Sequence, residues 1–338
     1  MNINEIARRA GVAKSTVSNV LTKRRYVSPE TTAKVLKACE ELNYVPNYFA
    51  SNILNAETNI IGLFLEIGNN DYYSYYNELF EGCVTQASNL EKQILIYFSP
   101  NKDSITTELG QGKSPLAGAI LLAPYQIDSR ISELEKKHIP YVTIGTMSKD
   151  NTSFSVDVKN EEAVKFILKH LIDYGHRSIL FINSMKDLEI TNERDNAIKE
   201  LLKEYKDLKV ITRYTEDKEN RAVSIIESID DNYSVILTSS DILAKDLYEY
   251  YQNKNIVIGR DISIASLGGT KYSDTLVPKL TSMTQNYVQL GSESVKMLVD
   301  VMENKIKKST HKYFECEIIY GESVRNLKEK INLKKKGR

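Results

Sequence analysis

The first 45 residues carry apolar side chains at helical spacing in three short segments. Between residues 3 and 10, and again between residues 17 and 21, apolar positions recur every three or four residues, which predicts two amphipathic helices. Gly11 is placed to end the first helix, because glycine readily adopts a left-handed conformation. Ser28 and Pro29 suit the N-cap and first turn of a third helix. Two short helices joined by a glycine turn predict a helix-turn-helix.

Residues 60–330 alternate short apolar runs with amphipathic stretches. Buried strands are expected at 60–67, 93–99, 117–123, 141–145, 177–183, 209–214, 234–238 and 262–267. The amphipathic stretches in the first half lie at 75–90, 104–111 and 129–137. Strand–helix alternation predicts parallel sheets joined by right-handed crossovers, and two successive runs of this kind predict two lobes.

Composition changes this picture mainly at the N-terminus. The 338 residues have a formal net charge of zero and are 41% hydrophobic, enough for two or three domains with sizeable cores. Residues 1–26, however, hold six basic side chains and one acidic side chain, Glu5. A basic head on a neutral body predicts a contact with a polyanion at one end of the chain only.

The second predicted helix has a polar face opposite its apolar one. If residues 17–21 face the core of the head, that polar face can enter the major groove of DNA, which admits an α-helix. A small helical bundle with a solvated charged face is the alternative, but it does not account for the concentration of positive charge. The residues expected to contact bases or phosphates are Lys14, Ser15, Thr16, Ser18, Asn19, Thr22, Lys23 and Arg24.

The rest of the composition excludes several classes of protein. Cys39, Cys83 and Cys316 are odd in number and far apart, which fits a reducing compartment and excludes a disulfide framework. Neither a signal peptide nor an apolar run near the ~18 residues of a membrane span is present, so a cytoplasmic protein without a membrane partner is expected. The four histidines lack metal-ligand spacing, and there is no complete phosphate-binding loop or nucleophile elbow. We therefore expect no enzyme activity, no metal and no cofactor.

The stretches INEIARRAGVAKSTVSNVL and VSPETTAKVLKACEELNYVPN resemble the head of the lactose-repressor (LacI/GalR) family of bacterial transcription regulators. Ala13, Asn19 and Asn43 replace the family's usual serine, arginine and glycine. Asn19 matters most, because arginine pairs with guanine whereas asparagine suits adenine. The matching residues are Ala10, Gly11, Val12, Thr16, Val17, Ser18, Val20, Leu21, Leu42, Tyr44, Pro46 and Asn47.

The resemblance implies that residues 46–58 form a hinge helix on operator DNA, where two copies pair in the minor groove and an apolar side chain wedges between base pairs. The spacing from Pro46 places Ile53 at the wedge with Leu54 beside it, and Asn47 at the start of the helix. An isolated helix this short is marginal in water, so it should order only when something packs on it. A plain linker without a role in DNA binding is the alternative.

The fold class implied is an all-α helix-turn-helix head followed by an α/β body of the periplasmic-binding-protein type, with two doubly wound parallel-sheet lobes. The last helix, 287–302, would return to the first lobe and the strand 313–320 to the second. Two bodies should pair as a homodimer, because a palindromic operator mirrors a two-fold axis. The expected parts are a head (1–45), a hinge (46–58), a body (59–330; first lobe about 59–157 and 287–311, second lobe about 158–286 and 312–330) and a basic tail (331–338).

In such a body a small ligand binds in the cleft, at the carboxyl ends of the strands. The resemblance implies that Arg194 grips effector oxygens and that Asp241 accepts sugar hydroxyls, although Asp241 also suits the N-cap of a helix at 242–252. Gly268 stands where the family commonly has an acidic residue. For the tyrosines, ordinary helix packing is the alternative. The residues expected to line the cleft are Asn69, Tyr75, Tyr76, Tyr125, Met147, Arg194, Asp241 and Gly268.

The function expected from these features is a sequence-specific repressor of a carbohydrate-utilisation operon, with operator DNA as its partner and a sugar as its effector. The effector would change the angle between the lobes, so that the paired hinge helices meet or separate. Two alternatives stay open. One is a sugar-binding module that does not regulate DNA. The other is a regulator controlled by a partner protein that docks on the first lobe, a mode of control that resembles the catabolite-control branch of the family.

Overall fold

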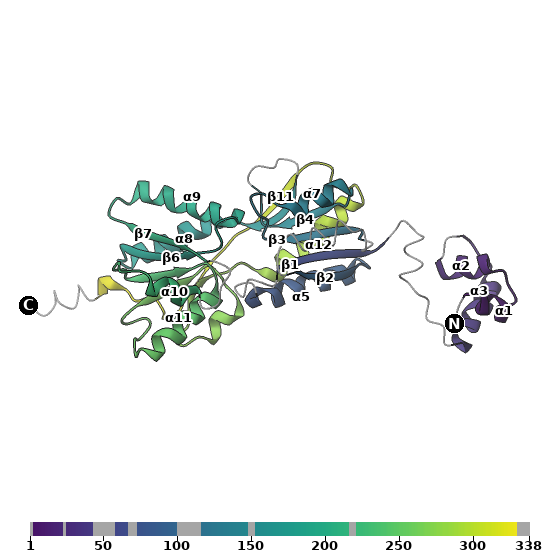
Figure 1. The fold of residues 1–338 in the computed structure, drawn as a ribbon, viewed down its shortest axis with the longest axis horizontal. Coiled ribbons are helices and arrows are strands. Elements are labelled where there is room, and N and C mark those ends of the chain that lie inside the picture. The colour runs from purple at the N-terminus through teal and green to yellow at the C-terminus, as the bar shows by residue number, and fades with distance from the viewer. Residues whose placement is uncertain are drawn as a thin grey trace, which may run out of the picture. The chain divides into compact units, whose positions relative to one another are not determined.

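The computed structural model describes residues 3–22, 25–42, 58–66, 73–99, 116–147, 153–215 and 221–329. The chain divides into two compact units, Met1–Thr58 and Asn59–Arg338 (Figure 1). The predicted helix 104–111, most of the hinge and the tail lie outside the described residues. So do the predicted contact residues Lys23, Arg24, Asn47, Ile53, Leu54 and Asn69.

The N-terminal unit holds three helices, α1 (Ile3–Ala10), α2 (Lys14–Thr22) and α3 (Pro29–Glu41). Their shared core contains the fully buried side chains of Ile6, Val17 and Val35. The sequence signals at the start of α3 act as expected, because the side chain of Ser28 accepts a hydrogen bond from the backbone of Thr31 and a proline opens the helix. This is the helix-turn-helix arrangement that the apolar periodicity predicts.

The first lobe of the second unit is built on a six-stranded parallel sheet in the order β11-β5-β4-β3-β1-β2. Alternate residues of its strands face opposite ways: Ile120 packs toward α5 (Tyr73–Asn89) and α12 (Tyr287–Met302), and Leu121 packs toward α7 (Ser129–Lys136). Strands buried on both faces explain the continuous apolar runs in the sequence. The strands are β1 (Ile60–Glu66), β2 (Gln93–Ser99), β3 (Gly118–Leu122), β4 (Tyr141–Ile144), β5 (Phe154–Val158) and β11 (Thr310–Phe314).

The second lobe repeats the plan with the order β12-β10-β9-β8-β6-β7, in which only the pair β10–β12 is antiparallel. Helices α8 (Asn160–Asp173) and α9 (Glu189–Glu204) cover one face of this sheet, and α10 (Arg221–Glu227) and α11 (Asp241–Asn253) cover the other (Figure 1). A 3₁₀ helix, η2 (Lys271–Thr275), follows β9. The strands are β6 (Ser178–Asn183), β7 (Lys209–Tyr214), β8 (Val235–Thr238), β9 (Ser263–Ser266), β10 (Thr281–Met283) and β12 (Ile318–Ile319).

The chain crosses between the lobes three times: after β5, between β10 and α12, and between β11 and β12. The return of α12 to the first lobe agrees with the sequence. The strand expected at 313–320 does not: Tyr313 and Phe314 pair with β5 in the first sheet, and only β12 joins the second. The single strand expected at 313–320 is divided between the two sheets, and residues 315–317 belong to neither. The third crossing lies in this gap, a few residues later than the sequence indicates.

The fold class predicted from the sequence is confirmed, since a helical head is followed by two parallel α/β lobes. His176, at the entrance to β6, has a structural role: its ring lies within hydrogen-bond distance of Ser234 Oγ (2.7 Å) and of the carbonyl of Arg325 (3.2 Å). Burial lowers its pKa to about 4. No helix in the described part of the chain is long and apolar enough to cross a membrane.

Candidate functional site

A cavity lies between the two lobes, at the carboxyl ends of the strands of both sheets. Its volume is about 80 Å³, counted as space open to the centre of a water molecule, which is room for several waters. Ligands bind in this place in doubly wound folds, because the loops at the strand ends converge there. Its described lining is Leu79, Leu122, Ala123, Pro124, Ile144, Gly145, Thr146, Asp157, Ser184, Ile190, Arg194, Thr215, Ser239, Ser240, Gly268, Gln285, Tyr287 and Leu290.

The second lobe contributes the polar wall of the cavity. Arg194, on α9, is 4% exposed and donates a hydrogen bond to Ser184 Oγ at 3.3 Å. Thr215 follows β7 and Ser239 follows β8, and both are buried. Within the described residues, neither hydroxyl has a hydrogen-bond partner. Buried hydroxyls are usually paired, so these two oxygens indicate where a bound molecule would make hydrogen bonds.

Asp241 lies behind this wall and does not line the cavity. Its carboxylate accepts hydrogen bonds from the backbone nitrogen and the hydroxyl of Thr270, both at 2.7 Å, and from Ser282 Oγ at 3.0 Å. The alternative role foreseen for it, as an N-cap, belongs instead to Ser240, whose side chain accepts from Leu243 N. Asp241 thus ties the start of α11 to the segments that follow β9 and form β10.

Gly268 lines the cavity directly in front of Asp241. A Cβ atom at position 268 would lie 2.5 Å from Asp241 Oδ1 and 2.6 Å from Asp241 N. Those distances are shorter than van der Waals contact, so the position of Asp241 leaves no space for a side chain. The carbonyl of Gly268 accepts a hydrogen bond from the Tyr287 hydroxyl of the first lobe at 2.8 Å. The glycine is therefore required by packing and also forms part of the contact between the lobes.

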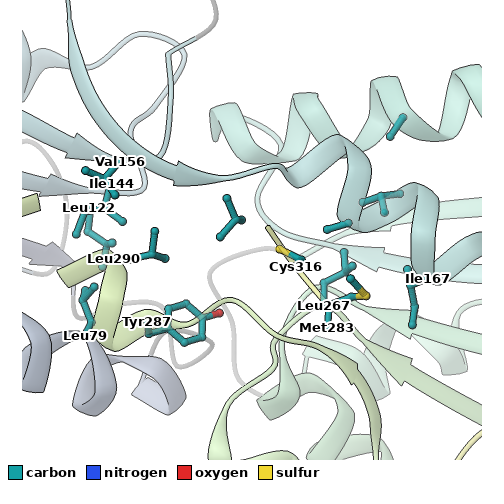
Figure 2. Close-up of a cluster of buried hydrophobic side chains, with 14 of the residues drawn as sticks. Leu79, Leu122, Ile144, Val156, Ile167, Leu267, Met283, Tyr287, Leu290 and Cys316 are labelled. Atoms are coloured by element: carbon teal, nitrogen blue, oxygen red, sulfur yellow. The ribbon is translucent and has the colours of Figure 1, made fainter. Parts of the chain in front are cut away.

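The first lobe contributes the apolar wall. Leu79 on α5, Leu122 and Ile144 at strand ends and Leu290 on α12 belong both to the lining and to the hydrophobic core. Figure 2 shows them on the first-lobe side, with the ring of Tyr287 between them and the second-lobe residues Leu267 and Met283. An apolar surface facing directional polar groups is the usual composition of a small-molecule site.

Asp157 is the acidic side chain of the described lining, and it comes from the end of β5. It accepts hydrogen bonds from Thr146 N, Val158 N and Asn160 Nδ2. The same Asn160 amide donates to Glu193 Oε2 on α9 at 2.9 Å, so the two carboxyl groups lie on either side of one amide. Burial raises the pKa of Asp157. Burial, followed by the charge of Asp157, raises the pKa of Glu193 to about 8.

The loop after β3 contributes Ala123 and Pro124 to the cavity lining and is held by a buried ion pair. Asp128 and Arg130 form an ion pair at 2.6 Å and are both almost fully buried. Asp128 also accepts from the backbone nitrogens of Tyr125 and Arg130, and the Arg130 guanidinium lies 5.4 Å from the centre of the Tyr125 ring. These contacts fix the segment 123–126, which pairs with the second lobe.

Four of the predicted effector residues do not line the cavity. Tyr76 is buried in the core and stacks on Phe80, so for this residue the helix-packing alternative describes the structure. Tyr125 packs under Arg130, and Met147 packs against the α7 side of the first sheet. Asp241 forms the network described above. Arg194 and Gly268 do line the cavity, whereas the side chain of Tyr75 and all of Asn69 lie outside the described residues.

Several lining residues were not foreseen from the sequence. Thr215 and Ser239 are the first residues after strands β7 and β8, whose ends were predicted, so their position was a usable signal. Asp157 was missed because β5 was not expected. At Tyr125 and Met147 the sequence indicates the correct loops, but the residues on the cavity wall are neighbours two positions away or less, namely Ala123, Pro124, Gly145 and Thr146.

The outward face of α2 carries the predicted DNA contacts. Lys14 and Ser15 are exposed, while Thr16, Ser18 and Asn19 are partly exposed and Val17 is fully buried. Lys14, Ser15, Ser18 and Asn19 are spaced so that they share one side of a helix. The side chain of Thr22 lies outside the described residues. This arrangement supplies a polar helix face that can approach base edges.

Comparisons with known proteins agree with this architecture. A model described as "Bacterial regulatory proteins, lacI family" matches residues 2–47, and one described as "Periplasmic binding protein-like domain" matches residues 168–324. The chain is 26% identical to catabolite control protein A of Priestia megaterium over 314 residues, covering 90% of this chain and 93% of the relative.

Two solved structures show the same fold over most of this chain. The lac repressor dimer bound to operator and the anti-inducer ONPF has a TM-score of 0.80 at 18% identity, covering 96% of this chain and 99% of that one. A complex of the transcriptional regulator CelR with cellobiose has a TM-score of 0.72 at 21% identity, again covering 96% and 99%.

A helix-turn-helix head joined to a two-lobed ligand-binding fold defines a DNA-binding transcription regulator. The chain belongs to the LacI family of bacterial regulatory proteins, with a periplasmic-binding-protein-like effector domain. This is a family of transcription regulators and not of enzymes.

Proposed function

We propose that this regulator represses genes for carbohydrate use in the cytoplasm, and that a small sugar in the inter-lobe cavity controls its binding to operator DNA. It acts as a homodimer on a pseudo-palindromic operator, with one head on each half-site. The observation that supports this most strongly is the cavity itself, in which Arg194 and two hydroxyls that have no hydrogen-bond partner among the described residues face an apolar wall.

The chemistry of the cavity suits a sugar. The guanidinium of Arg194 is a planar fork of donors that matches vicinal oxygens. The hydroxyls of Thr215 and Ser239 can each donate one hydrogen bond and accept two. On the other side, Leu122, Leu290 and the aromatic Tyr287 can pack on the C–H face of a sugar ring. The solved complex of CelR with cellobiose shows that a similar fold binds such a ligand.

Control of DNA binding requires the ligand to bias the angle between the lobes. Two hydrogen bonds join the lobes: the backbone nitrogen of Lys271 donates to Glu78 Oε1 on α5 at 3.0 Å, and, at the cavity, the Tyr287 hydroxyl donates to the Gly268 carbonyl at 2.8 Å. A molecule that touches both walls changes the balance of these contacts, and a ligand shifts an equilibrium only through such a difference. The hinge between body and head would transmit the change.

In the proposed complex with DNA, Lys14, Ser15 and Asn19 contact base edges from the major groove, and Thr16, Ser18, Thr22, Lys23 and Arg24 fix the register through phosphates. Asn19 pairs with adenine, where the family's usual arginine would pair with guanine. Asn47 starts a hinge helix, and Ile53 with Leu54 wedges into the minor groove. These residues complete the set expected from the sequence.

Two experiments test the proposal. The full chain and a chain starting at residue 59 are each used to select sites from a randomised DNA library. The full chain should recover a pseudo-palindrome and the shortened chain should recover nothing. Equal selection by both would show that the head does not bind DNA, and the protein would then be a sugar-binding module.

A panel of sugars is then titrated calorimetrically against the full chain, the Arg194→Gln variant and a matched control, Lys199→Gln, which removes an exposed charge on the same helix. We expect a sugar that binds the wild type and Lys199→Gln equally and Arg194→Gln at least ~10-fold more weakly, since hydrogen bonds to a charged group contribute about 1.5–3 kcal/mol. If no sugar binds the full chain, control by a partner protein that docks on the first lobe replaces the proposal.

A further inference from the structure

The N-terminus of α9 has no side-chain cap from its own lobe. Its N-cap residue is Leu188, which has no side-chain acceptor and makes no side-chain capping hydrogen bond. The first backbone N–H groups of a helix have no partner inside the helix, and they are normally satisfied by Ser, Thr, Asp or Asn at this position. Leu188 is 2% exposed. Within the second lobe its carbonyl accepts a hydrogen bond from Thr191 N at 3.2 Å, which leaves Glu189 N, at the first helical position, to find its acceptor elsewhere.

The first lobe supplies the acceptor instead. Glu189 N, at the first position of α9, donates to the carbonyl of Pro124 at 3.2 Å. On the other side of this contact Gln126 N donates to the carbonyl of Asp187 at 3.0 Å, and Tyr125 and Leu188 form an antiparallel bridge. The segments 124–126 and 187–189 therefore exchange backbone hydrogen bonds across the boundary between the lobes.

The two partners of this contact are held unequally. The first-lobe segment is fixed from below by the buried pair Asp128–Arg130, which binds Tyr125 N and approaches the carbonyl of Ala123 at 3.5 Å. In α9, by contrast, Glu189 is buried and one of its carboxylate oxygens, Oε1, has no hydrogen-bond partner among the described residues. An acceptor held by a buried ion pair thus faces Glu189 N, the first backbone donor of α9.

The helix end that receives this cap also carries part of the cavity. Ile190 and Arg194 lie in the first two turns of α9 and line the cavity, as does Pro124 on the opposite side of the contact. When the lobes separate, the hydrogen bonds of Glu189 and Gln126 are lost together. Uncapped first turns fray, because their N–H groups have no partner within the helix.

We propose that Pro124 caps α9 from the other lobe, so that closing the lobes and ordering the first turns of α9 are a single event. In the open form the turn that presents Ile190 and leads to Arg194 is frayed. In the closed form it is ordered and shapes the polar wall. This inference deepens the proposed function, because it names the contact through which lobe angle and ligand site affect each other.

The test uses hydrogen–deuterium exchange of the full chain with neither DNA nor effector, so it does not depend on the proposed function. Gln126 and Asp187 face each other as neighbours of the Tyr125–Leu188 bridge and are both exposed. Replacing them as Gln126→Cys and Asp187→Cys gives a disulfide that locks the lobes closed when oxidised. Backbone amides at 189–194 should exchange at least ~10-fold more slowly in the oxidised chain than in the reduced one.

A second variant gives α9 its own cap. Leu188→Asp places an acceptor at the N-cap, and Leu188→Ala is the matched control that removes the same side chain without supplying one. In the reduced double-cysteine background, Leu188→Asp should slow exchange at 189–194 toward the locked value, and Leu188→Ala should not. Equal exchange at these amides in the oxidised and reduced chains would overturn the proposal, and that comparison needs no change at Leu188.

Discussion

The two walls of the cavity are built by opposite means. The first-lobe wall consists largely of core residues such as Leu122 and Leu290, whose exposed edges offer contact area without direction. The second-lobe wall consists of polar groups, some held by the protein itself, as Asp241 is, and some left for a ligand, as Thr215 and Ser239 are. Apolar area discriminates poorly between similar ligands, whereas directional hydrogen bonds discriminate well.

The largest effect is expected from the network behind the second-lobe wall. Asp241→Ala leaves the backbone nitrogen of Thr270 and two buried hydroxyls without their acceptor, so we expect the free energy of unfolding to fall by about 3 kcal/mol. Chemical denaturation measures this. Glu249→Ala, an exposed acid on the same helix, should change stability by less than ~0.5 kcal/mol. An equal loss of unfolding free energy in the two variants would mean that the hydrogen bonds of Asp241 do not stabilise the second-lobe wall.

A smaller effect is expected from the first-lobe wall. Leu122→Ala removes core volume next to an existing cavity, so we expect a loss of about 2 kcal/mol in the free energy of unfolding, at the low end for buried leucines. Ligand affinity should fall by a similar factor for every sugar that binds, because only contact area is lost. A change in the order of preference among sugars, measured by calorimetry, would contradict the division of roles between the walls.

The free energy of unfolding should depend on pH through Glu193, which contacts Asn160 next to Asp157 of the cavity lining. Its pKa in the folded chain, about 8, lies above the ordinary value of 4.5, so between these values the folded state holds a proton that the unfolded state has lost. The free energy of unfolding should therefore decrease as pH rises from about 5 to about 8 and level off above that.

Glu193→Gln should reduce this slope, giving a difference of about 1–2 kcal/mol at pH 8, below the full value of the shift because Glu193 is partly exposed. Part of the slope should remain, because burial raises the pKa of Asp157 in the same direction. Thermal unfolding of both chains from pH 5 to pH 9 measures the difference. Parallel curves would show that Glu193 is ionised in the folded protein at neutral pH.

A substitution in the head should have the smallest effect on the cavity and on the stability of the body. Asn19→Arg is expected to leave ligand affinity and the unfolding of the body unchanged. It should move operator preference toward guanine at one position per half-site, by about 1–3 kcal/mol. Selection from a randomised operator library reads this out. An unchanged preference would show that Asn19 does not contact a base.

Local patterns predicted most of the fold but only part of the cavity. The strands 93–99 and 209–214 and the helix 287–302 were predicted with their observed ends, because apolar periodicity is a property of neighbouring residues. The strand β5 escaped because it is short and carries the buried acid Asp157. The role of Gly268 depends on Asp241, 27 positions away, and that proximity exists only in the folded chain. The direction of a side chain within a loop, as at Tyr125, also depends on contacts that exist only in the folded chain.

The claim that the cavity controls the head is tested most directly by linkage. The affinity of the selected operator is measured with and without saturating sugar, and the affinity of the same sugar is measured with and without saturating operator. Thermodynamic reciprocity requires both ratios to be one common factor, and an allosteric regulator typically shows about 5–150-fold. We predict equal ratios in this range for the wild type and ratios near one for Arg194→Gln. A sugar affinity that operator leaves unchanged in the wild type would contradict the account.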